Sequence, residues 1–407
     1  MKKFLSILLI ISILLAGISL FSCNTTDKND SQDDDHDGEI SAKDKEIMDE
    51  VISLMEDDTY DTDAFIAEFF GDFSIGRFDS GNNQDANLSK MYKIGDVLAV
   101  ENQKAGETTY QIVVDSKLCS VYRTNDGAKL HLESSTDYPY EYPLSIFTAF
   151  GVDMSLVYST EESPKDEPKL TYDSLSVSKD KKTVTFSKDY LKDVAEYLMS
   201  SLEPSDKQMK DFLADAKLSG SFDVERQLAT TVIEGKMDEI GDVKIEAGFE
   251  FKDQKPISLL SAFTLTADVD GVPVTTTQEN IVRNITYEND KIISLTVENR
   301  NTTSSKYTES GVDIDFSSNE VGIYDFATKN SVPDYVNIRV DAQNKVSYSG
   351  QTQESSSSLS FAVSDGILVY ELSADGLQQA YLAAEDVAFK APSDVTIPQD
   401  IYTVLPK

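Results

Sequence analysis

The sequence has no tryptophan, two histidines, and 36 lysine and arginine residues against 72 aspartate and glutamate residues. The lack of Trp argues against a carbohydrate cleft built on flat aromatic platforms, although 19 Tyr residues are present. The formal net charge of −36 repels a phosphate backbone and disfavours close binding along anionic lipid. We therefore exclude nucleic acid as a partner.

Catalytic signatures are missing as well. The chain has no H-E-x-x-H, C-x-x-C or G-x-S-x-G motif, no glycine-rich phosphate loop and no dinucleotide fingerprint. His131, in "KLHLES", has no partner motif, so we interpret it as a structural histidine. Because the chain has so many Asp and Glu residues, their spacing can neither identify nor exclude a catalytic pair of carboxylates of the glycosidase type. We expect a protein that is not an enzyme, with an extracytoplasmic hydrolase as the less favoured alternative.

The N-terminus has the form of an export signal. Lys2 and Lys3 precede an apolar run from Phe4 to Phe21, and Cys23 follows in "LFSC". A basic head, an apolar run and a small residue before a cleavage point are typical of a secretory signal. Two alternatives stay open: an uncleaved membrane helix, since the run is just long enough to span, and a plain signal with an incidental cysteine.

The "LFSC" stretch resembles the lipobox of bacterial lipoproteins, with Phe21 departing from the small or polar residue usual at its position. The resemblance implies that residues 1–22 are a signal peptide and that Cys23 carries a thioether-linked diacylglycerol. The chain would then be lipid-anchored on the extracytoplasmic face of the cell membrane. Two or more acyl chains hold a protein there stably, because each buried CH₂ contributes about 0.8 kcal/mol to the free energy of membrane binding. Cys119 would be left without a disulfide partner, as a small apolar strand residue.

Residues 23–40 form an acidic stretch without apolar periodicity, which predicts a disordered tether. The stretch "DDDHDGEISAKD" that overlaps its end resembles the EF-hand calcium loop, with Gly38 at the sharp turn. Calcium is accordingly the candidate cofactor. The alternative is that Ser41 and Asp44 form a helix N-cap pair. The candidate ligands are Asp33, Asp35, Asp37, Glu39, Ser41 and Asp44.

The remainder divides into two segments. Residues 41–186 contain helices followed by antiparallel strands, and residues 187–407 contain two helices followed by many strands. The alternative is that the two segments form one continuous domain. Helical spacing predicts helices over 42–55, 62–70, 191–202 and 205–216. The apolar stretch 143–159 is predicted as a further helix. Asp-Gly pairs at 270–271 and 365–366 predict hairpins. In "DVKIEAGFEFKD", the alternation places Val243, Ile245, Ala247, Phe249 and Phe251 on one face.

This order of elements predicts an α+β fold with large curved antiparallel β-sheets and a few packed helices. The pattern "MYKIGDVLAVEN" followed by "TTYQIVVD" resembles the strand pairs of the LolA/LppX-like half-barrel lipoproteins. That resemblance implies an apolar or lipid-like ligand, or a surface protein partner, bound on the curved sheet. The alternative of another class is an adhesion or scaffold protein that binds no small molecule.

Overall fold

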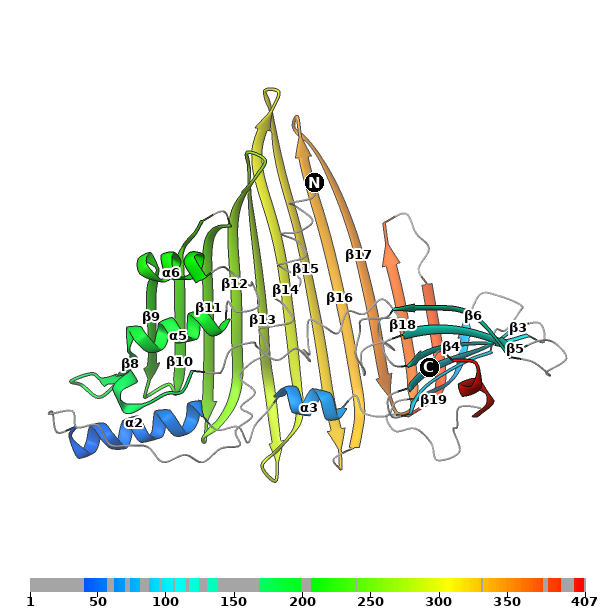
Figure 1. Cartoon of the computed structure of the whole chain (residues 1–407), viewed down its shortest axis with the longest axis horizontal. Helices are drawn as coiled ribbons and strands as arrows, with labels where there is room; N and C mark the ends of the chain where they lie inside the picture. The colour runs from blue at the N-terminus through cyan, green and yellow to red at the C-terminus, as the bar shows by residue number, and fades with distance from the viewer. Residues whose placement is uncertain are drawn as a thin grey trace. The chain divides into compact units, whose positions relative to one another are not determined.

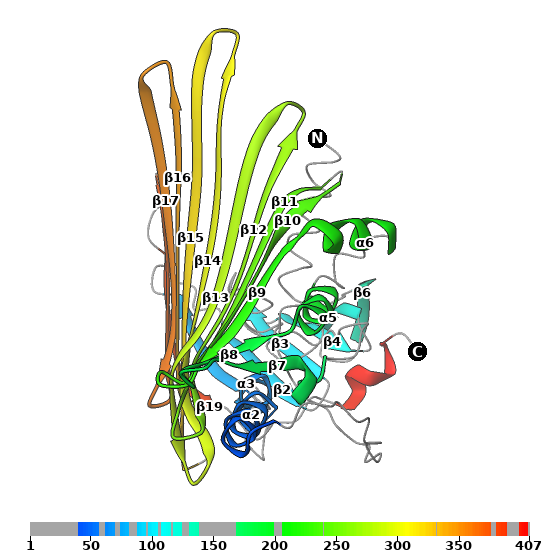
Figure 2. The same ribbon diagram turned by 90° about the vertical axis from the view of Figure 1, so that its left-hand side faces the viewer.

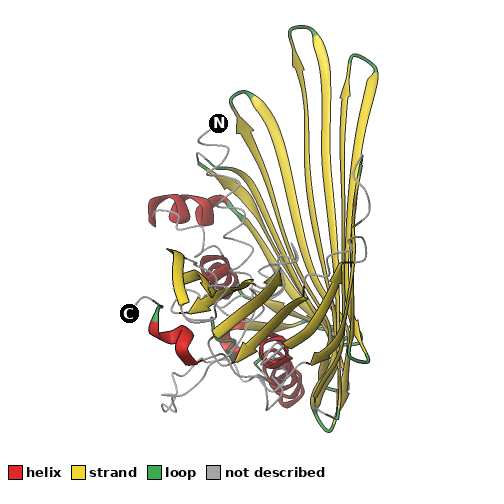
Figure 3. Cartoon of the chain, turned by 90° about the vertical axis from the view of Figure 1, so that its right-hand side faces the viewer, coloured by secondary structure: helices red, strands yellow, loops and turns green. Residues whose placement is uncertain are grey.

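The structure, a computed structural model, is mostly β, with a large antiparallel sheet and few helices (Figure 3). This confirms the β-rich fold predicted from the sequence. The predicted helix over 143–159, the signal peptide and most of the tether lie outside the residues that the structure describes. Those residues are 40–56, 62–69, 74–80, 88–94, 97–104, 107–114, 117–123, 130–137, 168–198, 206–238, 240–330, 332–375, 380–388 and 399–405.

The chain divides into two compact units. Unit 1 comprises Met1–Asp63, Glu161–Val321 and Gln343–Glu354, and unit 2 comprises Ala64–Thr160, Gly322–Ala342 and Ser355–Lys407. Both predicted segments, 41–186 and 187–407, therefore contribute residues to each unit. Strands β15 (Val312–Lys329), β16 (Val332–Tyr348) and β17 (Gln351–Ser364) are shared between the units.

Unit 1 is an antiparallel series of strands in which each strand from β7 to β14 pairs with the next along the chain. The helix predicted over 42–55 is present with these ends, and the helices predicted over 191–202 and 205–216 are present with different ends. The elements are α2 (Ala42–Met55), the 3₁₀ turn η3 (Tyr172–Ser174), β7 (Leu175–Val177), β8 (Thr183–Phe186), α5 (Lys188–Leu198), α6 (Asp206–Asp215), β9 (Lys217–Asp223), β10 (Leu228–Met237), β11 (Gly241–Lys252), β12 (Lys255–Val269), β13 (Val272–Glu288) and β14 (Lys291–Glu309).

The alternation predicted for β11 is confirmed. Val243 and Ile245 are 1% and 3% exposed and lie on one face, which we call face A and follow through the strand pairs from β9 to β14. The opposite face is face B. Helices α5 and α6 lie on face A over the strands that begin unit 1 (Figures 1 and 2). Their apolar side chains pack with those of face A into a core that contains Val194, Ala195, Met209, Phe212, Ile233, Met237, Phe263 and Leu265.

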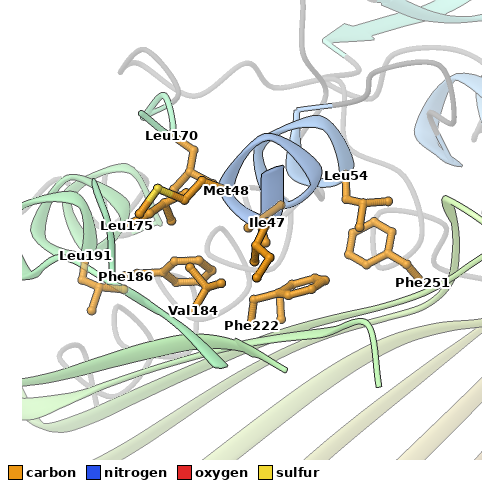
Figure 4. Packing of buried hydrophobic residues seen from close by; sticks show 12 residues of the cluster. Ile47, Met48, Leu54, Leu170, Leu175, Val184, Phe186, Leu191, Phe222 and Phe251 are labelled. Carbon is orange, nitrogen blue, oxygen red and sulfur yellow. The ribbon is translucent and has the colours of Figure 1, made fainter. Parts of the chain in front are cut away.

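Helix α2 packs into a second core of the same face. Figure 4 shows Ile47 of α2 directed toward Val184 and Phe222 of β8 and β9, Met48 beside Leu170 and Leu175, and Leu54 beside Phe251. The helix has an apolar stripe at helical spacing, so one side of it can be buried while the acidic side stays in water. Val184 and Phe222 are 0% and 1% exposed beneath it.

Tight turns join the long strands. Asp270 and Gly271 have φ angles of 56° and 86°, and Asp365 and Gly366 have φ angles of 51° and 74°. Two successive residues with positive φ are the requirement of the type I′ hairpin turn, which matches the right-handed twist of the strands. Both predicted Asp-Gly hairpins are therefore confirmed.

Unit 2 contains most of α3 (Thr62–Phe69) and an antiparallel series in which β17 pairs with β18, β18 with β19, β19 with β1, and each strand from β1 to β6 with the next. The pairing of β1 with β19 joins distant parts of the chain. The bounds are β1 (Ser74–Ser80), β2 (Leu88–Ile94), β3 (Val97–Lys104), β4 (Glu107–Val114), β5 (Lys117–Arg123), β6 (Leu130–Asp137), β18 (Ile367–Ala374), β19 (Ala380–Ala388) and the 3₁₀ turn η5 (Gln399–Thr403).

The core of unit 2 includes strand residues and one residue of η5. Ile112, Val121 and Ile401 are fully buried together, and Asp400 beside them accepts a hydrogen bond from Arg123 at 3.0 Å. Cys119 is 0% exposed, which confirms its interpretation as a small apolar strand residue. His131 lies on β6 and stacks on Tyr122 with ring centroids 5.0 Å apart.

Gly220 lies where α5 packs closely against the sheet, so a substitution at this position tests that packing. A Cβ at this position would lie 2.7 Å from Phe186 Cδ2 and 2.8 Å from Leu191 Cδ2. We expect Gly220→Ala to lower the free energy of unfolding by about 1–3 kcal/mol, because overpacking a filled core forces side chains from their rotamers. Denaturant titration of the purified protein measures the change.

Gly248→Ala is the matched control, since its Cβ would meet no atom nearer than 3.6 Å. An equal loss in both variants would show that the effect comes from changing a strand glycine rather than from the contact with α5.

Candidate functional site

Two regions of unit 1 bear on function: the start of α2, where the ion site is predicted, and face A of the sheet. At the first of these, the side chain of Ser41 caps the helix. The backbone N–H of Asp44 donates to Ser41 Oγ at 3.2 Å, and the Ser41 hydroxyl donates to Asp44 Oδ2 at 2.5 Å. The Asp44 carboxylate also forms an ion pair with the ammonium of Lys181, which lies in the turn between β7 and β8. The N-cap interpretation of Ser41 and Asp44 is therefore confirmed.

The pKa of the Asp44 carboxyl is lowered, first by the hydrogen bond from Lys181 and second by that from Ser41. Because the folded-state pKa lies below that of the unfolded chain, the contribution to stability is complete above the unfolded value. It is lost as the pH falls through the folded value. The ion pair thus fastens α2 to the β7–β8 hairpin at neutral pH.

The other predicted calcium ligands, Asp33, Asp35, Asp37 and Glu39, lie outside the described residues, as does Cys23. Within the described part of the chain, no group of three or more His, Cys, Asp or Glu side chains is arranged to hold a metal ion. The calcium loop stays a prediction. A calcium ion bound by Asp44 would have to compete with the ammonium of Lys181 for the same carboxylate.

Calcium titration of the full chain tests the loop. We expect heat of binding for the native sequence and tighter binding for Lys181→Met, because that change removes the competing ammonium. The same substitution should raise the pKa of Asp44 toward its ordinary value of 3.8, which NMR titration measures.

Asp35→Ala is the loss-of-site control for the same titration. Absence of heat at millimolar calcium in both the native chain and Lys181→Met would rule the loop out.

Face A changes character between β12 and β13. Ile245 on β11 lies opposite Phe263 on β12, and Phe263 lies opposite Gln278 on β13, which in turn lies opposite Asn301 on β14. Phe263 is 4% exposed and Gln278 is 6% exposed, so both ends of this step are buried. A continuous row of side chains therefore passes from the helix-covered core to carboxamides without leaving the face.

The neighbouring row repeats this change. Ser261 lies opposite Asn280, and Asn280 lies opposite Asn299. Directly opposed residues have Cβ atoms about 4.5–5.5 Å apart, so the carboxamides of the two rows form one compact group. We call it the amide block; its members are Gln278, Asn280, Asn299 and Asn301. An apolar row with Leu259, Val282 and Val297, which are 7%, 3% and 1% exposed, borders it.

Two acceptors of the amide block have no donor in the described part of the chain: Gln278 Oε1 and Asn280 Oδ1 are buried and accept no hydrogen bond there. A buried polar group left in this condition costs about 1–3 kcal/mol. Native structures usually satisfy such groups with protein, water or ligand. The amide block is therefore the place on face A where a donor from outside the chain would be most favourable.

Charge separates the two faces of β11–β14. Between the register shifts, the paired residues of face A lie within 242–250 of β11, 258–269 of β12, 272–283 of β13 and 296–305 of β14. They carry only apolar, hydroxyl and carboxamide side chains, in a chain that is 27% charged. The charged side chains of these paired segments lie on face B: Asp242, Lys244, Glu246, Glu250, Asp268, Glu279, Arg283, Glu298 and Arg300.

Two arginines neutralise the most buried carboxylate of face B. The Glu298 side chain is 6% exposed and accepts contacts from Arg283 Nη2 at 2.7 Å and from Arg300 Nη2 at 2.5 Å. Arg300 also lies 4.0 Å from Glu279. A buried carboxylate needs such partners, because an unpaired charge is costly to remove from water. Face B thus pairs its buried charge, whereas face A keeps unpaired acceptors.

Sequence reasoning did not find the amide block. Its signal was present in "TTTQENIVRN" and "TVENRNTT", where carboxamides occupy alternate positions otherwise typical of apolar residues. Only the register shows that these alternate positions continue the same face as Val243 and Ile245.

Comparison with protein-family models, with curated proteins and with solved structures gives no match. In the described part of the chain, no helix is both long and apolar enough to span a membrane.

Proposed function

We propose that the chain is an exported lipoprotein, held on the extracytoplasmic face of the cell membrane by acyl chains on Cys23. The proposal is that it is not an enzyme but binds a lipid-like ligand on the curved sheet of unit 1. The "LFSC" stretch and the apolar run before it support the anchor. The step on face A from buried apolar side chains to the buried and half-buried carboxamides of the amide block supports the ligand, since an amphiphile has both kinds of surface.

The arrangement of unit 1 favours the binding of a sheltered ligand rather than the display of a flat surface to a partner. Helices α2, α5 and α6 cover the apolar part of face A, while the amide block and the Leu259–Val282–Val297 row continue beyond their contacts. Ligand sites of small molecules are mostly apolar with a few placed polar groups, which is the composition of this region. The half-barrel resemblance of the sequence points the same way.

The β16–β17 hairpin favours a second candidate function, a display protein that binds a surface partner. Within Gln343–Glu354 nearly every residue is exposed, and Tyr348 is 55% and Val346 38% exposed. Lys345 and Glu354 face each other across the hairpin at 3.4 Å. A hairpin exposed on both faces adds little to a core and is free to meet another protein.

The anchor is tested with Cys23→Ala in an exporting bacterium supplied with a labelled fatty acid. We expect label on the native chain and release of the unlabelled variant from the membrane fraction, because the acyl chains supply the membrane affinity. Label on both proteins, or cytosolic native protein with Met1 attached, would contradict the anchor.

The ligand is tested by mass spectrometry of lipid extracted from the exported full chain carrying Cys23→Ala, which avoids the covalent lipid. We expect a stoichiometric amphiphile to co-purify. Adding Thr303→Lys should remove it, because this places a charge on face A beside Asn301.

Thr302→Lys places the same charge one residue away on face B and should leave the bound amphiphile unchanged. Absence of any co-purifying amphiphile, or equal loss in both lysine variants, would favour the display function.

A further inference from the structure

We propose that the amide block selects the head group of the ligand, and that this head group is uncharged and rich in O–H or N–H donors. The inference rests on the proposed function, because it concerns the same face of unit 1. It adds the chemical class of the ligand: an amphiphile with a hydroxyl or amide head, as opposed to a fatty acid, a phospholipid or a hydrocarbon.

The unpaired atoms determine the need for donors. Gln278 Oε1 and Asn280 Oδ1 are acceptors, and their side chains lie on neighbouring strand positions of one face. Gln278 is more than nine-tenths buried, so its oxygen is held at the sheet and cannot turn outward without exposing the row beside it. A head group that brings donors to both oxygens gains hydrogen bonds and removes the desolvation cost present in the free protein.

The surroundings determine the lack of charge. On face A of β12–β14, the amide block is bordered by the hydroxyl residues Thr276, Thr303 and Ser261, by Phe263, and by the apolar row of Leu259, Val282 and Val297. Thr276 and Thr303 already contact each other through their hydroxyls at 3.4 Å. With no charged side chain on these paired positions, an anionic or cationic head would lose its hydration without gaining a counter-charge.

The geometry also decides which end of the ligand lies where. The apolar row of Leu259, Val282 and Val297 runs along one side of the amide block, and the core under α5 and α6 lies on the β12 side. The core under α5 and α6 is already filled, so the acyl chain follows the row of Leu259, Val282 and Val297 while its head stays over Gln278 and Asn280. The contact is by hydrogen bonds and needs no aromatic platform, which agrees with the absence of Trp.

The experiment compares amphiphiles that share a dodecyl or lauroyl chain and differ in the head. Dodecyl maltoside supplies sugar hydroxyls and lauroyl glycinamide supplies amide N–H groups. Lauric acid is an anion, and dodecylphosphocholine is a zwitterion without donors. Binding to the full-length protein carrying Cys23→Ala, from which bound lipid has been removed, is measured by calorimetry below each critical micelle concentration.

We expect at least one of the two donor heads to bind about tenfold or more tightly than lauric acid and dodecylphosphocholine, the effect of one or two net hydrogen bonds. The stronger of the two donor heads identifies the sugar or the amide as the source. Equal affinity across all heads would overturn the head-group inference and leave the proposed lipid-like ligand standing. Absence of binding by all probes would remove both.

Gln278→Met assigns the preference to the amide block. The side chain keeps its length and loses the acceptor, so the free protein should be as stable as the native one or more stable, while the preference for the donor head falls about tenfold. Gln343→Met, on the exposed hairpin, is the matched control and should change neither. A preference that survives in Gln278→Met would place recognition elsewhere and overturn the inference.

Discussion

The register of the antiparallel strands β9–β14, which shifts only after Glu250 on β11 and after Arg283 on β13 among the described strand pairs, is the constraint on which unit 1 depends. Successive side chains of a strand point to opposite faces, so a slip of one residue would exchange the two faces throughout. Here that exchange would move Glu298 and its two arginines to face A and would take Phe263 and Leu265 out of the core under α5 and α6. The cost of burying those charges and the loss of the core both oppose the slip. Two chemically unlike faces therefore specify one pairing.

The same constraint explains why polar side chains tolerate burial on face A. Gln278 and Asn280 alternate with Glu279 and Ile281, which lie on the other face. Their burial follows from the register that the apolar residues of β11 and β12 enforce, since a strand cannot move two residues independently of the rest. The strong apolar pairs thus hold weaker polar positions in place, and that stored cost is available to a ligand which supplies donors.

Much of the fold could be predicted from the sequence because its local signals are strong. The stripe of Ile47, Val51 and Leu54 predicted α2 with the correct ends, and the Asp-Gly pairs located two turns that need positive φ. The pairing of β1 with β19 could not be predicted, since it joins residues near 75 to residues near 387 and no short-range pattern encodes such a contact. The full length of β14 could not be predicted either, because Lys291–Glu309 continues through polar residues that interrupt the alternation on which a strand prediction depends. At the predicted ion site, the sequence correctly offered the cap for Ser41 and Asp44, but Lys181, far along the chain, carried no sign of its role.

The attachment of α2 has a mechanical consequence. Any pull on the chain before Ser41 reaches unit 1 first at the N-terminus of this helix, where the Asp44–Lys181 ion pair and the hydroxyl of Ser41 lie. The force then passes to the apolar side of α2 and from there to β8 and β9. In these strands it is distributed over the backbone hydrogen bonds that join them to each other and to their neighbours. Under a force applied to the chain before Ser41, α2 would detach from unit 1 before the strands of the sheet separate.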